Sequence, residues 1–162
     1  MKTTSIRIGF VFFFILMLLL DFPPALANMQ KSSLPIIITP NNLEWASFDA
    51  FPPGAKAAIL AGDPRKAGYF MLRIKIPANY KILPNWQTAT VYVTVLAGKY
   101  KIGVGDTFNS KNGKTLPSAG SVIIPANAHL YFWTTKGTVL EVHGIGPWDI
   151  HYINSADDPR NH

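Results

Sequence analysis

The sequence predicts an all-β fold, a sandwich or barrel of short strands in one domain. Runs of alternating or β-branched residues recur along the chain, and glycine or proline turn signals separate them every eight to twelve residues or so. After the N-terminal apolar run, no window has the period of an amphipathic helix. The 162 residues include no cysteine, so packing and sheet hydrogen bonds, rather than disulfides, must hold the fold together.

The N-terminal residues have the three-part layout of a secretory signal peptide. Lys2 and Arg7 precede the apolar run 10–20, and the small-residue site Ala25-Leu26-Ala27 follows it. This run is shorter than the ~20 residues that a membrane-spanning helix needs. We therefore expect residues 1–27 to be cleaved and the protein to be exported, periplasmic or secreted, with no membrane span afterwards. An uncleaved anchor is the alternative.

The rest of the chain divides into a leader, a domain and a tail. Residues 28–35 form the expected flexible leader, 36–156 the folded domain, and 157–162 a charged C-terminal tail. The domain contains no internal repeat and no low-complexity linker, which predicts one structural unit rather than two.

The first expected strands are short and bounded by turns. Residues 35–39 are an extended apolar start, and 43–48 is the next β-type run, ended by Pro52-Pro53-Gly54. Residues 56–61 are apolar and end at Gly62-Asp63-Pro64, a second turn signal.

Residues 69–76 show the clearest alternation in the chain. Phe70, Leu72, Ile74 and Ile76 share one face of the predicted strand. Arg73 and Lys75 lie on the opposite face, which we expect to meet solvent.

The second half continues the same pattern. Residues 90–96 are rich in valine, threonine and tyrosine, Gly98 turns the chain into 99–104, and 109–114 is a polar loop. Residues 121–124 are a short expected strand, apolar from Val122 onwards, that stops at a proline. Three further strands are expected at 129–134, 138–143 and 148–153.

The charge balance argues against nucleic acid as a partner. The net charge is +6, but the positive residues are scattered rather than gathered among stacking aromatics. Pairs such as Lys99 and Lys101 alternate along a strand, as on a solvated sheet face.

Several sequence blocks, in a fixed order, are similar to those of a known superfamily. The blocks are Ala61-Gly62-Asp63-Pro64 with Gly68-Tyr69-Phe70 and Arg73, Ile76-Pro77-Ala78 with Tyr80, Val93–Gly98, Leu116-Pro117 with Gly120-Ser121 and Ile124-Pro125-Ala126, and His143–Trp148 with Asp157-Asp158-Pro159-Arg160. Together they resemble the cupin superfamily, and most of all its short ChrR-like members. The resemblance implies a double-stranded β-helix, a jelly-roll barrel of two facing antiparallel sheets.

The resemblance also implies a metal site, whose ligands this chain lacks. The superfamily motif G-x5-H-x-H-x3,4-E-x6-G, counted back from Gly98, places Asn85, Gln87 and Val91 at its ligand positions, and the second motif places Leu130 at the fourth. Transition metals favour imidazole and carboxylate ligands. A buried divalent ion without an anion nearby is very costly. We therefore expect four vestigial metal positions, no bound metal and no cofactor.

The preferred functional hypothesis is a metal-free module that binds or senses an unknown small molecule. Asn85 and Gln87 would offer neutral amides at the mouth of the barrel, and Trp86 between them would stack on a ligand. His143 is the fourth candidate ligand-binding residue. A homodimer is compatible with this hypothesis.

Two alternatives remain open. The chain would be a cupin enzyme, either isomerase-like with His143 or His129 as general acid or base, or dioxygenase-like with shifted metal ligands. No nucleophile–histidine–carboxylate motif is present, so we assign no catalytic residue. The second alternative is a structural or interaction protein whose barrel is filled by side chains.

Overall fold

The computed structural model describes residues 34–162. The expected signal peptide and most of the leader lie outside this range. Residues 37–162 form one compact unit. In the described part of the chain, no helix has the length and apolar character needed to cross a membrane.

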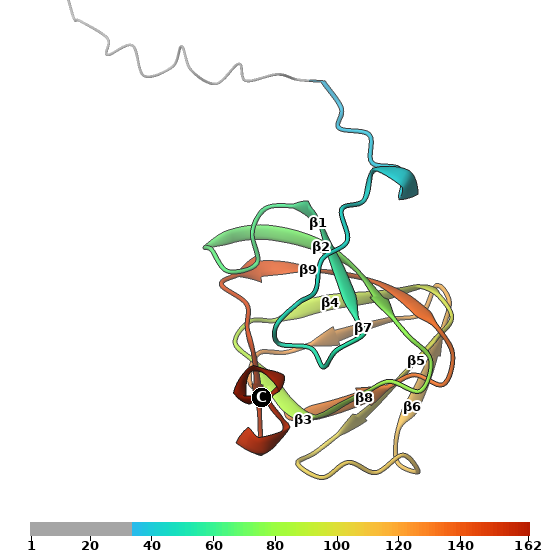
Figure 1. The fold of residues 1–162 in the computed structure, drawn as a ribbon, viewed down its shortest axis with the longest axis vertical. Coiled ribbons are helices and arrows are strands. Elements are labelled where there is room, and N and C mark those ends of the chain that lie inside the picture. Colours follow the sequence, from blue (N-terminus) through green and yellow to red (C-terminus); the bar gives the residue numbers. More distant parts are fainter. Residues whose placement is uncertain (1–33) are drawn as a thin grey trace, which may run out of the picture. The chain divides into compact units, whose positions relative to one another are not determined.

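Ten strands form two antiparallel five-stranded sheets that face each other (Figure 1). The strands are β1 (Lys56–Ala61), β2 (Gly68–Ile76), β3 (Lys81–Gln87), β4 (Val91–Ala97), β5 (Lys99–Val104), β6 (Lys114–Pro117), β7 (Ser121–Ile124), β8 (Leu130–Trp133), β9 (Thr138–Gly146) and β10 (Ile150–Tyr152). The first sheet has the order β1-β2-β9-β4-β7 and the second β10-β3-β8-β5-β6. The predicted all-β, jelly-roll architecture is confirmed.

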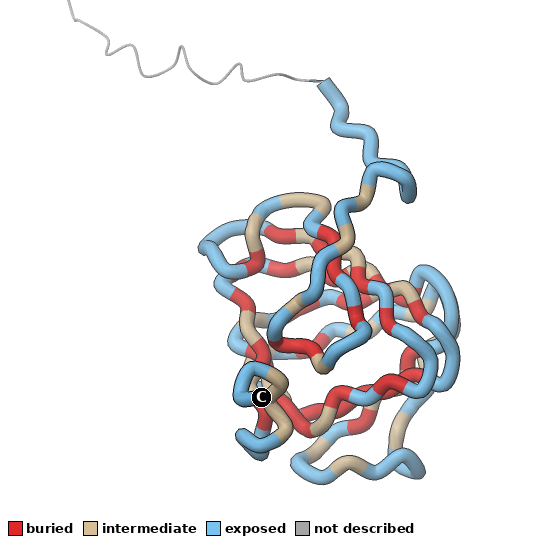
Figure 2. The backbone as a smooth tube through the Cα atoms, in the orientation of Figure 1, coloured by how far each residue is buried: buried red, intermediate tan, exposed pale blue. Residues whose placement is uncertain are grey.

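The core lies between the two sheets, where alternate residues of each strand are buried (Figure 2). On β2, the predicted inward set of Phe70, Leu72, Ile74 and Ile76 is buried throughout. Strand β4 contributes Val91, Val93 and Val95 from the other half of the same sheet. Because successive side chains of a strand point to opposite faces of the sheet, only every second residue can reach the interior.

The outer faces of the two sheets differ in how they are covered. Loop residue Phe108 packs on the outer face of β8, with its ring 5.1 Å from that of Tyr131 and 5.5 Å from that of Trp133. On the first sheet, Tyr69 and Tyr92 remain partly exposed. The loop between β5 and β6 thus covers aromatic surface that the second sheet would otherwise expose.

The strand pattern departs from the prediction at four places. Residues 35–39, expected as the first extended run, form no strand and are exposed. Strand β3 was not predicted because Pro84 interrupts the β-type pattern; the register shift between Ile82 and Asn85 accommodates this proline. The short edge strand β6 begins at Lys114, the last residue of the predicted polar loop. Residues 43–48, expected as a strand, make only the isolated bridge from Ala46 to Ala57.

The C-terminal residues 157–162 are held against the second sheet by an arginine. Two short 3-10 turns, Ser155–Asp157 and Pro159–Asn161, bring Arg160 back towards the start of β10. Its guanidinium donates to both carboxylate oxygens of Asp149, to Asp158, and to the carbonyl of Ile150 at 2.6 Å. This predicted tail is therefore tied to the connection between β9 and β10.

Candidate functional site

The four mapped metal positions all face the interior between the sheets. Asn85 and Gln87 lie on β3, Val91 on β4 and Leu130 on β8, with exposed fractions of 0, 3, 0 and 2%. The motif glycine Gly98 has φ +83°, and a Cβ there would meet the carbonyl oxygen of Gly137. The turn at Gly98, from which the ligand positions were counted, thus has a backbone conformation that favours glycine.

The two amides at these positions have different partners. The Gln87 Oε1 atom accepts a hydrogen bond of 2.7 Å from the indole Nε1 of Trp148. The Asn85 Nδ2 atom donates to the carbonyl of Leu83 at 2.8 Å, while its Oδ1 atom has no partner among residues 34–162. Gln87 therefore fixes the position of an aromatic side chain 61 residues away in sequence.

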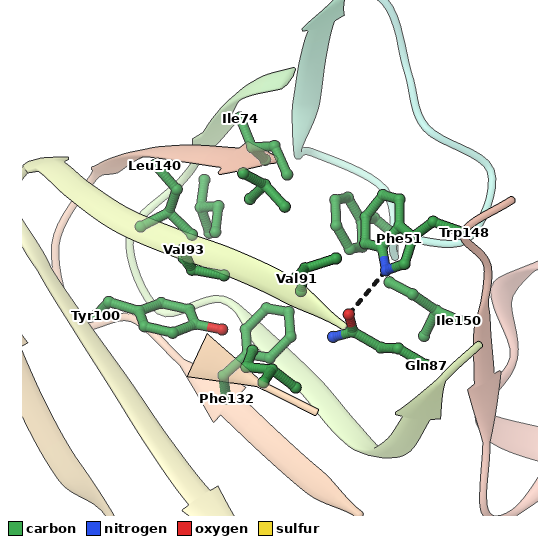
Figure 3. Close-up of a pocket in the computed structure, with 13 residues that line it drawn as sticks. Phe51, Ile74, Gln87, Val91, Val93, Tyr100, Phe132, Leu140, Trp148 and Ile150 are labelled. Atoms are coloured by element: carbon green, nitrogen blue, oxygen red, sulfur yellow. Dashed lines mark hydrogen bonds between the residues drawn. The ribbon is translucent and has the colours of Figure 1, made fainter. Parts of the chain in front are cut away.

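The interior is almost filled by side chains. A cavity of about 20 Å³ lies between the sheets, and about 10–15 Å³ is enough for a single water molecule. Aliphatic and aromatic side chains from both sheets line it, and its polar side chains are Gln87 and Tyr100 (Figure 3). In this conformation the cavity has no room for a ligand larger than one or two atoms.

Trp86 and His143 lie away from this interior. Trp86 is on the opposite face of β3 from Asn85 and Gln87, and its ring stacks on His151 at 4.4 Å. His143 stacks on Tyr92 at 5.1 Å, on the outer face of the first sheet. The four residues proposed from sequence to share one binding site are thus on three different surfaces.

His129, the other histidine considered as an acid or base, also lies outside. Leu130 points into the core, and the alternation of the strand turns His129 towards solvent, where Nδ1 lies 2.5 Å from Asp106 Oδ1. Within residues 34–162, no three histidine, aspartate or glutamate side chains gather closely enough to hold a metal ion.

A second, larger hollow lies beside Trp148, and we call it the Trp148 groove. Its volume is about 560 Å³. It is lined by residues 46–50, Ala57 and Ile59 of β1, Pro64 and Arg65, Thr88, residues 147–149, and Arg160. Figure 1 shows how the segment before β1 and the connection from β9 to β10 come side by side. Sequence reasoning missed this groove, because no motif unites its segments.

Trp148 is a shared wall between the interior cavity and the groove. Its indole lines both hollows and is almost fully buried. Phe70 stacks on it at 5.5 Å and Phe48 at 5.5 Å. These stacks, and the hydrogen bond to Gln87, hold the indole in one orientation.

Comparison with known proteins identifies the fold. No protein-family model and no curated protein matches the chain. Among solved structures, the polyketide cyclase RemF from Streptomyces resistomycificus superposes with a TM-score of 0.65 at 11% identity, over 79% of this chain and 92% of that one. The chain has the cupin fold.

Two other solved structures support this assignment. An RmlC-like cupin protein from Ralstonia eutropha matches with a TM-score of 0.58 at 15% identity, over 75% of this chain and 74% of that one. A putative acetylacetone dioxygenase from Methylibium petroleiphilum matches with a TM-score of 0.56 at 18% identity, over 81% and 90%. At these identities the likeness establishes the cupin fold and not an activity.

The donors in this cupin fold do not fit a transition metal at the mapped positions. The carbonyl oxygen of Gln87 is already bonded to Trp148, and Val91 and Leu130 offer no donor atom. The Asn85 Oδ1 atom is the one acceptor of the four that has no partner among the described residues. A single neutral oxygen cannot replace the hydration of a divalent ion.

The rim of the groove carries charges of both signs. All the donor groups of Arg160 bond to Asp149, Asp158 and the backbone, so this cation is neutralised within the fold. Arg65 contacts Asp63 through Nε at 3.4 Å and is otherwise well exposed. Its two terminal nitrogens make no hydrogen bond within residues 34–162, so they are available to a ligand.

Proposed function

We propose that this protein is an exported, metal-free member of the cupin superfamily that binds a small molecule in the Trp148 groove. The observation that carries the proposal is the hydrogen bond from Trp148 Nε1 to Gln87 Oε1. Gln87 stands at a position that the motif comparison assigns to a metal ligand. In this protein its side chain instead holds Trp148, the wall of the groove. In a metal-binding cupin the residue at this position would coordinate the metal, whereas here we propose that Gln87 stabilises the surface that binds the ligand.

The size and lining of the groove support a small-molecule ligand. Its volume of about 560 Å³ lies within the ~300–1,000 Å³ range of ligand pockets. Phe48, Ile59 and the edge of Trp148 offer apolar contact, while the free terminal nitrogens of Arg65 suit a carboxylate or a polar oxygen. An amphipathic compound with an apolar body and one polar end matches this lining.

The test combines metal analysis with a ligand screen. Protein purified without chelator should contain no stoichiometric transition metal. A library of apolar carboxylates and neutral analogues is then titrated while the melting temperature is recorded. A ligand of the groove should lose about tenfold or more in affinity in Phe48→Ala, because truncation removes apolar contact area. Phe108→Ala, on the outer face of the second sheet, is the matched control and should bind as the unaltered protein does.

Two results would count against the proposal. Stoichiometric zinc, iron or manganese would contradict the metal-free part. A ligand whose affinity falls equally in Phe48→Ala and Phe108→Ala would show that binding does not involve the groove.

A structural or interaction role is the second candidate, and the nearly filled interior favours it. With a cavity of about 20 Å³, the barrel could serve as a rigid scaffold that presents its surface to a protein. The ligand screen distinguishes the two candidates. For a scaffold, no small molecule would raise the melting temperature in a saturable way. Phe48→Ala and Phe108→Ala would then change only the stability of the protein.

A further inference from the structure

The outer face of the second sheet carries a row of lysines and aromatic side chains. Lys81 of β3 and Lys101 of β5 both pair in register with Trp133 of β8, the strand between them (Figure 1). The Lys101 ammonium group lies 5.9 Å from the centre of the Trp133 ring, and that of Lys81 lies 5.2 Å from the centre of the Phe108 ring. Neighbouring strands are about 4.8 Å apart, so the two lysines leave the sheet roughly 10 Å from each other.

Two further lysines lie at one end of this row. Lys99 is on the same face of β5 as Lys101, because Tyr100 between them points into the core. The Thr138 hydroxyl lies within hydrogen-bond distance of the carbonyls of Lys99 and Lys136, at 3.0 and 3.1 Å. The start of β5 and the turn before β9 therefore bring Lys99 and Lys136 together, and both are exposed.

The loop between β5 and β6 adds two more. Gly113 lies against the Trp133 ring so closely that a Cβ would collide with it. This contact holds the loop, with the exposed residues Lys111 and Lys114, beside the same row. The six lysines are far apart in the sequence, and only the fold gathers them. We call the surface that they form the lysine face: Lys81, Lys99, Lys101, Lys111, Lys114 and Lys136.

This face has almost no compensating negative charge. Asp106 is the single acidic residue between positions 67 and 140, and its carboxylate is already bonded to His129. Within residues 34–162, no lysine of the face makes a salt bridge. Most other cations in this part of the chain pair with carboxylates, namely Arg65, Lys66, Arg73 and Arg160. Ion pairs thus neutralise much of the positive charge elsewhere and leave the lysine face strongly positive.

The form of the face indicates which kind of anionic partner it fits. Trp133 and Tyr131 are only 6% and 1% exposed, because Phe108 and its loop cover them, so nucleic-acid bases could not stack on their rings. The lysines are spread both across the strands and along them. A planar surface of anionic groups can meet all of them at once, whereas a linear polymer would follow one row.

We propose that the lysine face docks this protein on a membrane surface that carries anionic lipid headgroups. The contact is electrostatic and peripheral, because the loop holds the large aromatic rings away from the bilayer. Each lysine close to such a surface strengthens binding by about fivefold. The proposal is independent of the function assigned to the Trp148 groove, since no lysine of the face lines that groove.

Vesicle sedimentation tests the proposal. The purified protein should pellet with vesicles of phosphatidylcholine mixed with phosphatidylglycerol but not with phosphatidylcholine alone, and added salt should release it. The double variant Lys99→Gln, Lys136→Gln removes two exposed ammonium groups that have no partner in the described chain, so its melting temperature should be unchanged. It should bind the anionic vesicles about 25-fold more weakly.

A second double variant, Lys56→Gln with Lys66→Gln, is the matched control. It removes the same charge from β1 and from the turn before β2, outside the lysine face, and should bind nearly as tightly as the unaltered protein. An equal loss of binding in the two double variants would show that net charge rather than this face is responsible, and would overturn the proposal. Binding to heparin without binding to anionic vesicles would overturn it too, because the partner would then be a linear polyanion.

Discussion

Gln87 is the buried residue that positions Trp148. Its carbonyl accepts from Trp148, and its side chain also lines the interior cavity. A leucine at this position would offer no acceptor to the indole. Gln87 thus contacts both the interior cavity and Trp148, the wall of the groove.

Replacing Gln87 by methionine should destabilise the protein. The change keeps the volume but removes the acceptor of the Trp148 indole, leaving a buried donor unpaired at a cost of about 1–3 kcal/mol. Urea unfolding measures this cost. In a Trp148→Phe background the donor is absent, so the same substitution should cost less; equal costs in both backgrounds would show that the hydrogen bond carries no coupling energy.

At the level of single residues, sequence reasoning placed the inward set well. The motif counted back from Gly98 assigned Asn85, Gln87 and Val91 to one site in the barrel. All three are buried, the two amides on β3 and Val91 on β4 of the facing sheet. It did not find the partner of Gln87, because Trp148 lies 61 residues away and nothing local marks the contact. The proposed roles of Trp86 and His143 in ligand binding stay predictions.

At the level of elements, strands with clean alternation were predictable and irregular ones were not. Buried and more exposed residues alternate along most of strand β2, as its sequence predicts. Strand β3 contains Pro84, which in the sequence indicates the end of a strand. Residues 43–48 have strand-like composition, but a 3-10 turn at Pro40–Asn42 precedes them and only one bridge forms. Pairing partners, rather than intrinsic propensity, decided both cases.

The C-terminal turn should make stability depend on pH in the acidic range. The side-chain hydrogen bond from Arg160 is the main cause that lowers the pKa of Asp158 below its ordinary value of 3.8. A lowered pKa in the folded state means that this stabilisation is complete above pH 3.8 and is lost as the pH falls through the folded-state value.

Arg160→Gln tests this dependence. The variant should be less stable by about 1 kcal/mol at neutral pH, a modest figure because the ion pairs are partly exposed. Its stability should also fall less steeply than that of the unaltered protein as the pH falls below 3.8. Urea midpoints recorded across this range provide the measurement. Parallel pH profiles for the two proteins would contradict the role given to Asp158.

At the level of the whole molecule, the groove could not be predicted from the sequence. Its walls come from residues 46–50, 64–65, 147–149 and Arg160, which only the folded chain brings together. The cupin resemblance predicted the two-sheet architecture. Its blocks include Pro64, Trp148 and Arg160, but the segment before β1 lies outside them, and nothing in the blocks indicated that these residues meet at one groove. Loops and ends, which vary most within a fold, thus shape the proposed site.

Export is a prediction about the whole chain that processing can test. When expressed with its N-terminus intact in a secreting host, the protein should be recovered outside the cytoplasm and begin at Asn28, as read by mass spectrometry. Replacing Ala27 by lysine should block cleavage and leave a heavier, cell-associated chain. Recovery of the unaltered protein with residues 1–27 still attached would rule out cleavage at this site.

The hydrogen bond between Gln87 and Trp148 also constrains how this chain could change over evolutionary time. A neutral histidine there has one acceptor nitrogen, so it could accept from the indole or bind a metal, but not both. Gaining a metal at this position would therefore leave a buried donor unpaired and cost stability. The hydrogen bond that holds the wall of the groove therefore opposes the gain of a metal ligand at this position.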